Sequence, residues 1–160
     1  MNKRRVCLPC RKKIREELAA ERAGFTRLPG AIVLGLVGAI AGGAGWAFIG
    51  VVTNAEIGYV AVGVGFLAGF CALLGAGGRK GTPIQTVAVF CAILGLVLGK
   101  YFSIAYFVKQ QVPDLSYFDP RMVDFFVQFL PKTLSPFDAL WAFLALGIAW
   151  RMAKPTEVAI

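Results

Sequence analysis

The chain has 160 residues, of which 58% are hydrophobic and 16% are charged, and its formal net charge is +8. A soluble domain of this length could not bury so much apolar surface, so lipid must surround much of the chain. The same composition excludes a disordered chain and a disulfide-stapled secreted module. Histidine is absent, which excludes His-based catalytic triads and zinc or haem sites that need a His ligand.

Residues 1–29 form a basic tail, which we expect to be cytoplasmic and to contain an amphipathic helix. Cys7 and Cys10 form a CxxC pair in this tail. Two thiolates at this spacing supply half of a tetrahedral zinc site, and the tail has no further Cys or His to complete it. Three interpretations stay open: inert thiols without a ligand, a zinc ion shared across a dimer or with a partner, and thiol redox chemistry favoured by the flanking cations.

Four uninterrupted apolar stretches follow the tail and predict an all-α, polytopic membrane protein with four transmembrane helices. They cover residues 30–53, 57–76, 84–108 and 136–152. At a rise of about 1.5 Å per residue, their lengths are comparable to a hydrocarbon core that is roughly 30 Å thick. We therefore expect residues 30–152 to form one four-helix membrane domain and residues 153–160 to form a short cytoplasmic tail.

An outer segment, residues 109–135, separates the third and fourth stretches and contains a predicted amphipathic helix that begins at Asp119 and Pro120. Its apolar side chains recur at helical spacing, at Met122, Phe125, Phe126 and Phe129. This helix would lie either flat in the outer membrane interface or over the mouth of the bundle as a lid.

Loop residues support these boundaries and give the direction of the chain. Thr82 and Gln85 are expected to cap the third stretch, and Ser135 and Asp138 the fourth. Most Lys and Arg residues fall in the tail, in the loop between the second and third stretches, and after the fourth stretch. By the positive-inside rule, both termini should face the cytoplasm.

Glycine and alanine recur at intervals of three or four residues on one face of each of the first three stretches. The predicted helix-packing residues are Gly35, Gly38, Gly42 and Gly45 in the first stretch, Gly58, Ala61, Gly65 and Ala68 in the second, and Gly95 and Gly99 in the third. Lipid gives helices no hydrophobic reason to associate, so close contact through small residues is expected to hold them together. A glycine-lined pore is less favoured, because a permeation path normally has several inward polar groups.

Two ionisable residues stand out in the apolar part of the sequence. Lys100 lies well inside the third stretch, and Glu56 lies at the outer mouth of the second. Lys100 is expected to pair with Glu56 or to extend its ammonium group to the interface; the alternative is a role in ion or proton handling. The sequence contains no P-loop, GxGxxG or GxSxG motif, so we expect no enzymatic activity.

Glycine-rich segments at residues 55–65, 77–81 and 98–101 resemble a loosely defined group of uncharacterised small bacterial four-span membrane proteins. The resemblance covers roughly residues 30–150. Members of that group often carry a zinc-ribbon-like cytoplasmic head with several cysteines, of which this chain has a single CxxC. The resemblance implies a location in the bacterial inner membrane and implies no particular activity.

These features predict a non-catalytic accessory or structural subunit of a larger membrane assembly. Its partners would be membrane lipids, other membrane-protein subunits or further copies of itself, and no nucleic acid, since the basic tail suits anionic lipid headgroups better. The alternative is a small oligomeric transporter or channel with Lys100 and Glu56 on its path. No cofactor is expected, apart from the zinc ion considered for Cys7 and Cys10.

Overall fold

The computed structural model describes residues 25–53, 58–114, 116–133 and 135–155, together with Lys12 and Glu16. The elements of this part are the 3-10 turn η1 (Phe25–Arg27) and the helices α2 (Leu28–Thr53), α3 (Val60–Gly75), α4 (Thr82–Gln111), α5 (Pro120–Thr133) and α6 (Pro136–Met152). All of them are helical, as the apolar stretches predict. The bounds of α2, α3, α4 and α6 lie within three residues of the four apolar stretches.

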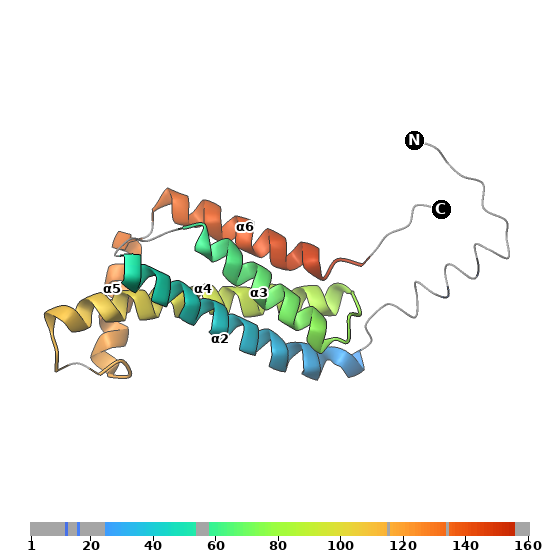
Figure 1. Ribbon diagram of the computed structural model, residues 1–160, viewed down its shortest axis with the longest axis horizontal. Coiled ribbons are helices and arrows are strands. Elements are labelled where there is room, and N and C mark those ends of the chain that lie inside the picture. Colours follow the sequence, from blue (N-terminus) through green and yellow to red (C-terminus); the bar gives the residue numbers. More distant parts are fainter. Residues whose placement is uncertain are drawn as a thin grey trace.

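Four helices run side by side along the molecule, and α5 crosses one end of them (Figure 1). The helices α3 and α4 pack against each other, and both contact α2 and α6. The start of α2 and the end of α6 lie at the same end of this bundle, called here the terminal end (Figure 1). The opposite end, where α5 lies, is called the α5 end.

The helices α2 and α4 are long and apolar enough to cross a membrane. The helix α3 is apolar but has 16 residues, so it measures about 24 Å, which is less than a hydrocarbon core of roughly 30 Å. The helix α6 contributes a span only if it is counted together with α5 as one bent span. Helix length and composition therefore support two or three membrane spans, fewer than the four predicted from the apolar stretches.

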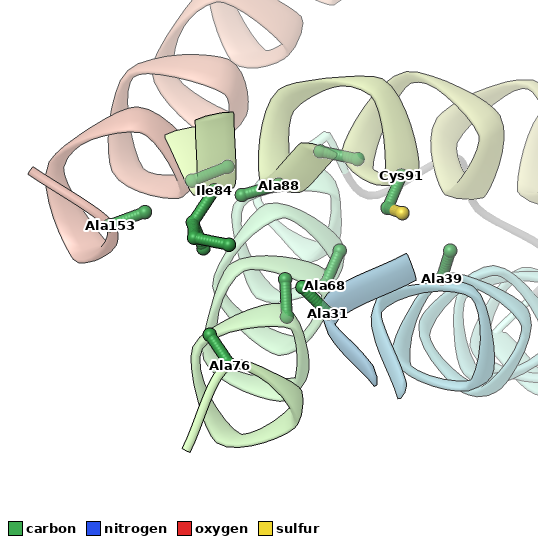
Figure 2. Packing of buried hydrophobic residues seen from close by; sticks show 11 residues of the cluster. Ala31, Ala39, Ala68, Ala76, Ile84, Ala88, Cys91 and Ala153 are labelled. Atoms are coloured by element: carbon green, nitrogen blue, oxygen red, sulfur yellow. The ribbon is translucent and has the colours of Figure 1, made fainter. Parts of the chain in front are cut away.

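Small side chains form the core near the terminal end. The buried cluster consists of Ala31, Ala39, Ala68, Ala72, Ala76, Ile84, Ala88, Cys91, Ala92, Ala149 and Ala153. Figure 2 shows the labelled alanines turned into the space between neighbouring helices, with Ile84 among them. Alanine loses almost no side-chain entropy when it is buried and lets helix backbones approach closely, so these positions favour a tightly packed bundle.

Two hydrogen bonds join the start of α4 to the end of α6. The backbone N–H of Gly81 donates to the carbonyl oxygen of Ala153 at 3.1 Å, and Gln85 Nε2 donates to the carbonyl oxygen of Trp150 at 3.3 Å. The cap predicted from Thr82 and Gln85 is wrong, because Gly81 occupies the N-cap position and no side chain caps it. Gln85 instead satisfies a carbonyl group at the end of the neighbouring helix.

Candidate functional site

Lys100 is a buried cation within the bundle. It lies in α4, only 7% of its surface is exposed, and its Nζ donates a hydrogen bond to Asp138 Oδ2 of α6 at 3.4 Å. The Asp138 side chain is also largely covered, with 21% exposed. Burying a charge is very unfavourable unless an opposite charge lies nearby, so Asp138 helps a lysine to occupy this position in an apolar helix.

Asp138 also caps the helix on which it lies. The backbone N–H of Ser135 donates to Asp138 Oδ2 at 3.1 Å, and Ser135 Oγ accepts a hydrogen bond from the backbone N–H of Phe137 at 3.3 Å. Pro136 occupies the first turn, where a missing N–H costs nothing. The cap predicted from Ser135 and Asp138 is therefore confirmed, and the same carboxylate joins α6 to α4.

The described residues give Lys100 a partner in Asp138, and the predicted pairing with Glu56 stays a prediction. Glu56 lies outside the described residues, whereas Asp138 lies 38 positions further along the chain than Lys100. The sequence predicts Asp138 as a helix cap, and its contact with Lys100 follows from the packing of α6 against α4. A signal was nevertheless present, because Asp138 opens the fourth apolar stretch on the side of the membrane toward which Lys100 is displaced.

An apolar cavity with a volume of about 230 Å³ lies beside this ion pair. Its lining residues are Trp46 of α2, Gly58 and Ala61 at the start of α3, Leu96, Val97 and Lys100 of α4, Phe126 and Leu130 of α5, and Asp138, Trp141 and Ala142 of α6. Apart from the ion pair, these side chains are apolar or aromatic. The cavity is thus suited to an apolar guest, and among the described lining residues the Lys100–Asp138 pair is the polar part of its wall.

The helix α5 is attached to the bundle through contacts with α4. Met122 is 1% exposed and packs beside Ala105, while the rings of Tyr101 and Phe126 meet edge to face with centroids 5.3 Å apart. The hydroxyl of Tyr101 donates a hydrogen bond to the carbonyl oxygen of Tyr117 at 2.6 Å. These contacts place Phe126 over the cavity.

The predicted apolar stripe of α5 lies in two different surroundings. Met122 and Phe126 face the bundle, whereas Phe125 and Phe129 are exposed. Phe125 and Phe129 line a second apolar hollow, which α5 forms with the last turns of α4. One side of α5 therefore covers the bundle end as a lid would, and a second, exposed apolar side borders the hollow beside the last turns of α4.

Glycine brings α2 into backbone contact with α4. A Cβ atom placed on Gly43 would lie 2.8 Å from the carbonyl oxygen of Gly95 and 3.2 Å from the backbone nitrogen of Gly99. A Cβ atom on Gly95 would lie 3.0 Å from the carbonyl oxygen of Ala39. Gly35 lies similarly close to the Cys91 side chain. No larger residue fits between these helices without moving them apart.

The helix α3 is packed in the same way on two sides. Toward α2, a Cβ atom on Gly38 would lie 2.8 Å from the carbonyl oxygen of Leu67, and one on Gly42 would lie 3.2 Å from Val64 Cα.

Toward α6, a Cβ atom on Gly65 would collide with the backbone of Ala145, and one on Gly69 would lie 3.0 Å from Ala149 Cα. Two pairs of small residues, each four positions apart, thus oppose each other across the contact between α3 and α6. Of the other predicted packing residues, Ala61 and Ala68 are buried, and Gly58 lies against the Trp141 ring.

Gly45 is a wrong prediction for packing within the chain. It is exposed, and a Cβ atom placed there would have no neighbour within 4 Å. At 3.6 residues per turn, Gly45 is rotated by about 80° from Gly35, which carries it off the buried side of α2. Gly43 and Gly69 lie at helix contacts that the sequence prediction does not include. The signal for Gly43 is the spacing of Gly35, Ala39 and Gly43, which are four positions apart.

The sequence prediction of a zinc ion concerns residues outside the described part, since both Cys7 and Cys10 lie there. Among the described residues, no group of three or more His, Cys, Asp or Glu side chains is placed to hold a metal ion. No model of a protein family, no curated protein and no solved structure matches the chain. The resemblance to small bacterial membrane proteins therefore stays a prediction, and the candidate site rests on its own geometry.

Proposed function

We propose that the protein is a non-catalytic membrane protein that acts as an accessory or structural subunit of a larger membrane assembly. In this proposal it spans a bacterial inner membrane four times, its termini are cytoplasmic, and α5 lies in the outer interface. It needs no cofactor, and a zinc ion at Cys7 and Cys10 stays an open alternative. The observation that carries the proposal is an exposed face of α2 on which two small residues, Ala41 and Gly45, lie four positions apart.

This face of α2 lies on the side that packs against neither α3 nor α4. It combines small residues with larger apolar ones, namely Leu34, Val37, Ala41, Gly45, Phe48 and Val52, all of them exposed. At 100° per residue these positions fall within one narrow sector of the helix. A small residue four positions from another, with larger apolar side chains around them, is the pattern through which membrane helices associate.

The charges at the two ends support the proposed orientation. The described residues at the terminal end carry the cations Arg27, Arg79, Lys80, Arg151 and Lys154. The described residues at and beyond the α5 end carry Lys109, Arg121 and Lys132 together with Asp114, Asp119, Asp124 and Asp138. The more positive terminal end is the one expected on the cytoplasmic side.

The association is tested with a substitution at Gly45, because a side chain added there meets no part of the chain itself. Gly45→Leu should leave the protein folded and weaken its co-purification with partner subunits from native membranes in mild detergent. Gly63→Leu is the matched control, since Gly63 is an exposed glycine of α3 with equally open surroundings. Gly42→Leu would instead disturb contacts within the chain, so it does not test association.

The proposal fails if the wild-type protein purifies alone in mild detergent. It also fails if Gly45→Leu and Gly63→Leu retain partner subunits equally, as judged by mass spectrometry of the co-purified proteins.

A small oligomeric transporter is the second candidate, and the buried Lys100–Asp138 pair favours it, because ionisable groups inside a membrane often mark an ion path. Glu56 belongs to this alternative as well. Liposome flux measured for the wild type and for Lys100→Met decides between the two candidates: a flux that the substitution abolishes in folded protein supports the transporter.

A further inference from the structure

The cavity beside Lys100 and Asp138 is an apolar hollow that is partly open to the outside. Its volume is about 230 Å³. An engineered apolar cavity of about 150 Å³ in another protein stays free of water and takes up benzene. Walls as apolar as these offer water few hydrogen-bond partners, so the cavity favours an apolar guest.

The position of Val97 shows from which side such a guest can enter. Val97 lines the cavity, yet 48% of its surface is exposed. Ile93, one turn earlier on α4, is exposed as well. The cavity is therefore continuous with an apolar outer surface of α4, and a hydrocarbon chain can reach it without crossing a polar surface.

The charges around the cavity determine which part of a lipid it can select. Lys100 and Asp138 carry opposite charges and are paired, and the Asp138 carboxylate already accepts hydrogen bonds from Lys100 and from the backbone of Ser135. A charged headgroup beside this pair would be attracted by one member of the pair and repelled by the other. Recognition should therefore depend on the hydrocarbon chain and not on the charge of the headgroup.

We propose that this cavity binds one hydrocarbon chain of a membrane lipid. The chain enters past Val97 and lies between Trp46 and Trp141, with Phe126 and Leu130 of α5 covering it. The lipid headgroup stays outside the cavity. Bound lipid would in this way fill the space where five helices converge and would join α5 to the rest of the bundle.

The experiment measures quenching of tryptophan fluorescence by brominated phosphatidylcholine in vesicles. The sequence has three Trp residues, of which Trp46 and Trp141 line the cavity and Trp150 does not. Trp150 is 44% exposed, whereas Trp141 is partly buried. A variant that retains only Trp141 is compared with one that retains only Trp150, the other tryptophans being replaced by Phe.

If a lipid chain occupies the cavity, Trp141 should be quenched at least as strongly as the more exposed Trp150. Ala142→Leu, which fills the cavity, should then remove most of the quenching of Trp141. Ala139→Leu is the matched control, because Ala139 is an exposed residue of the same helix that does not line the cavity. Val97→Phe, at an exposed position, should narrow the opening and reduce quenching without placing a larger side chain in the packed core.

The proposal is overturned if Trp141 is quenched less than Trp150. It is also overturned if both Ala142→Leu and Val97→Phe, in protein that elutes as a single folded species, leave the quenching of Trp141 unchanged. Brominated phosphatidylglycerol should quench Trp141 to the same extent as brominated phosphatidylcholine. Clearly stronger quenching by the anionic lipid would show that the site recognises the lipid headgroup, which would contradict the proposal.

Discussion

Single residues in this protein hold helices together through more than one interaction. Asp138 is the clearest case, since its Oδ2 atom accepts hydrogen bonds from the backbone of Ser135 and from the ammonium group of Lys100. The first interaction stabilises the beginning of α6, and the second joins α6 to α4. Loss of the carboxylate charge should therefore weaken a contact between helices as well as a helix end.

We predict a favourable coupling between Lys100 and Asp138 in a double-mutant cycle. Asp138→Asn keeps an oxygen that can cap α6 but removes the charge, so it should lower the free energy of unfolding by about 2 kcal/mol, because Lys100 stays buried. Lys100→Met combined with Asp138→Asn should recover much of that loss, with a coupling energy of about 1–3 kcal/mol. Unfolding in mixed micelles, followed by circular dichroism, measures all four proteins.

Ser135→Ala is the control for the capping interaction alone. It should cost about 1 kcal/mol, the usual value for an N-cap, whether or not Lys100 is present. Additive effects of the Lys100 and Asp138 substitutions would contradict the predicted pairing.

At the scale of helices, contact between small residues determines which faces meet. Gly65 and Gly69 of α3 lie opposite Ala145 and Ala149 of α6, so the two backbones are in direct contact. Gly65→Ala adds a methyl group that collides with Ala145 and should destabilise the protein by about 1–3 kcal/mol through overpacking. Thermal unfolding in detergent measures this loss.

Gly147→Ala is the matched control, because Gly147 is a helical glycine in α6 with open space around it. A methyl group there meets no neighbour, and alanine is favoured over glycine within a helix by about 0.5–1 kcal/mol. A loss of stability for Gly147→Ala as large as that for Gly65→Ala would show that the cost lies in α6 itself and not in its contact with α3.

The attachment of α5 to the bundle depends on one buried side chain more than on its exposed aromatic residues. Met122 is buried beside Ala105, so Met122→Ala should cost about 2–5 kcal/mol or release α5 from the bundle. Phe125→Ala, at an exposed position of the same stripe, should cost far less. Limited proteolysis within residues 116–119 reports the release of α5, and equal cleavage of both variants would contradict this assignment.

The helices α2, α3, α4 and α6 could be predicted from the sequence, because each coincides with an uninterrupted run of apolar residues. The face that each small residue occupies was harder to predict. Gly35 and Gly38 were assigned to a packing face and lie at helix contacts, but Gly45 turns outward since intervals of three and four residues do not keep a constant direction around a helix. The pairing of Lys100 with Asp138 could not be predicted from local patterns, because it depends on how α4 and α6 pack.

At the scale of the whole molecule, helix packing bears on the number of spans. Gly30 at the start of α2 and Gly75 at the end of α3 are in contact at the terminal end. An arrangement in which α2 crosses the membrane and α3 does not would leave these two glycines on opposite sides. If α2 crosses the membrane, we therefore expect α3 to cross with it, as the proposed four-span arrangement needs.

We predict that residues 2, 79 and 156 face the cytoplasm and that residues 54 and 116 face outward. Single cysteines at these positions in a variant without the four natural cysteines would be labelled with a membrane-impermeant thiol reagent in whole cells and in inverted vesicles. Arg79→Cys and Ser116→Cys distinguish four spans from an arrangement in which only α2 and α4 cross the membrane. If only α2 and α4 crossed, Arg79→Cys would react from outside and Ser116→Cys from inside, the reverse of the pattern expected for four spans.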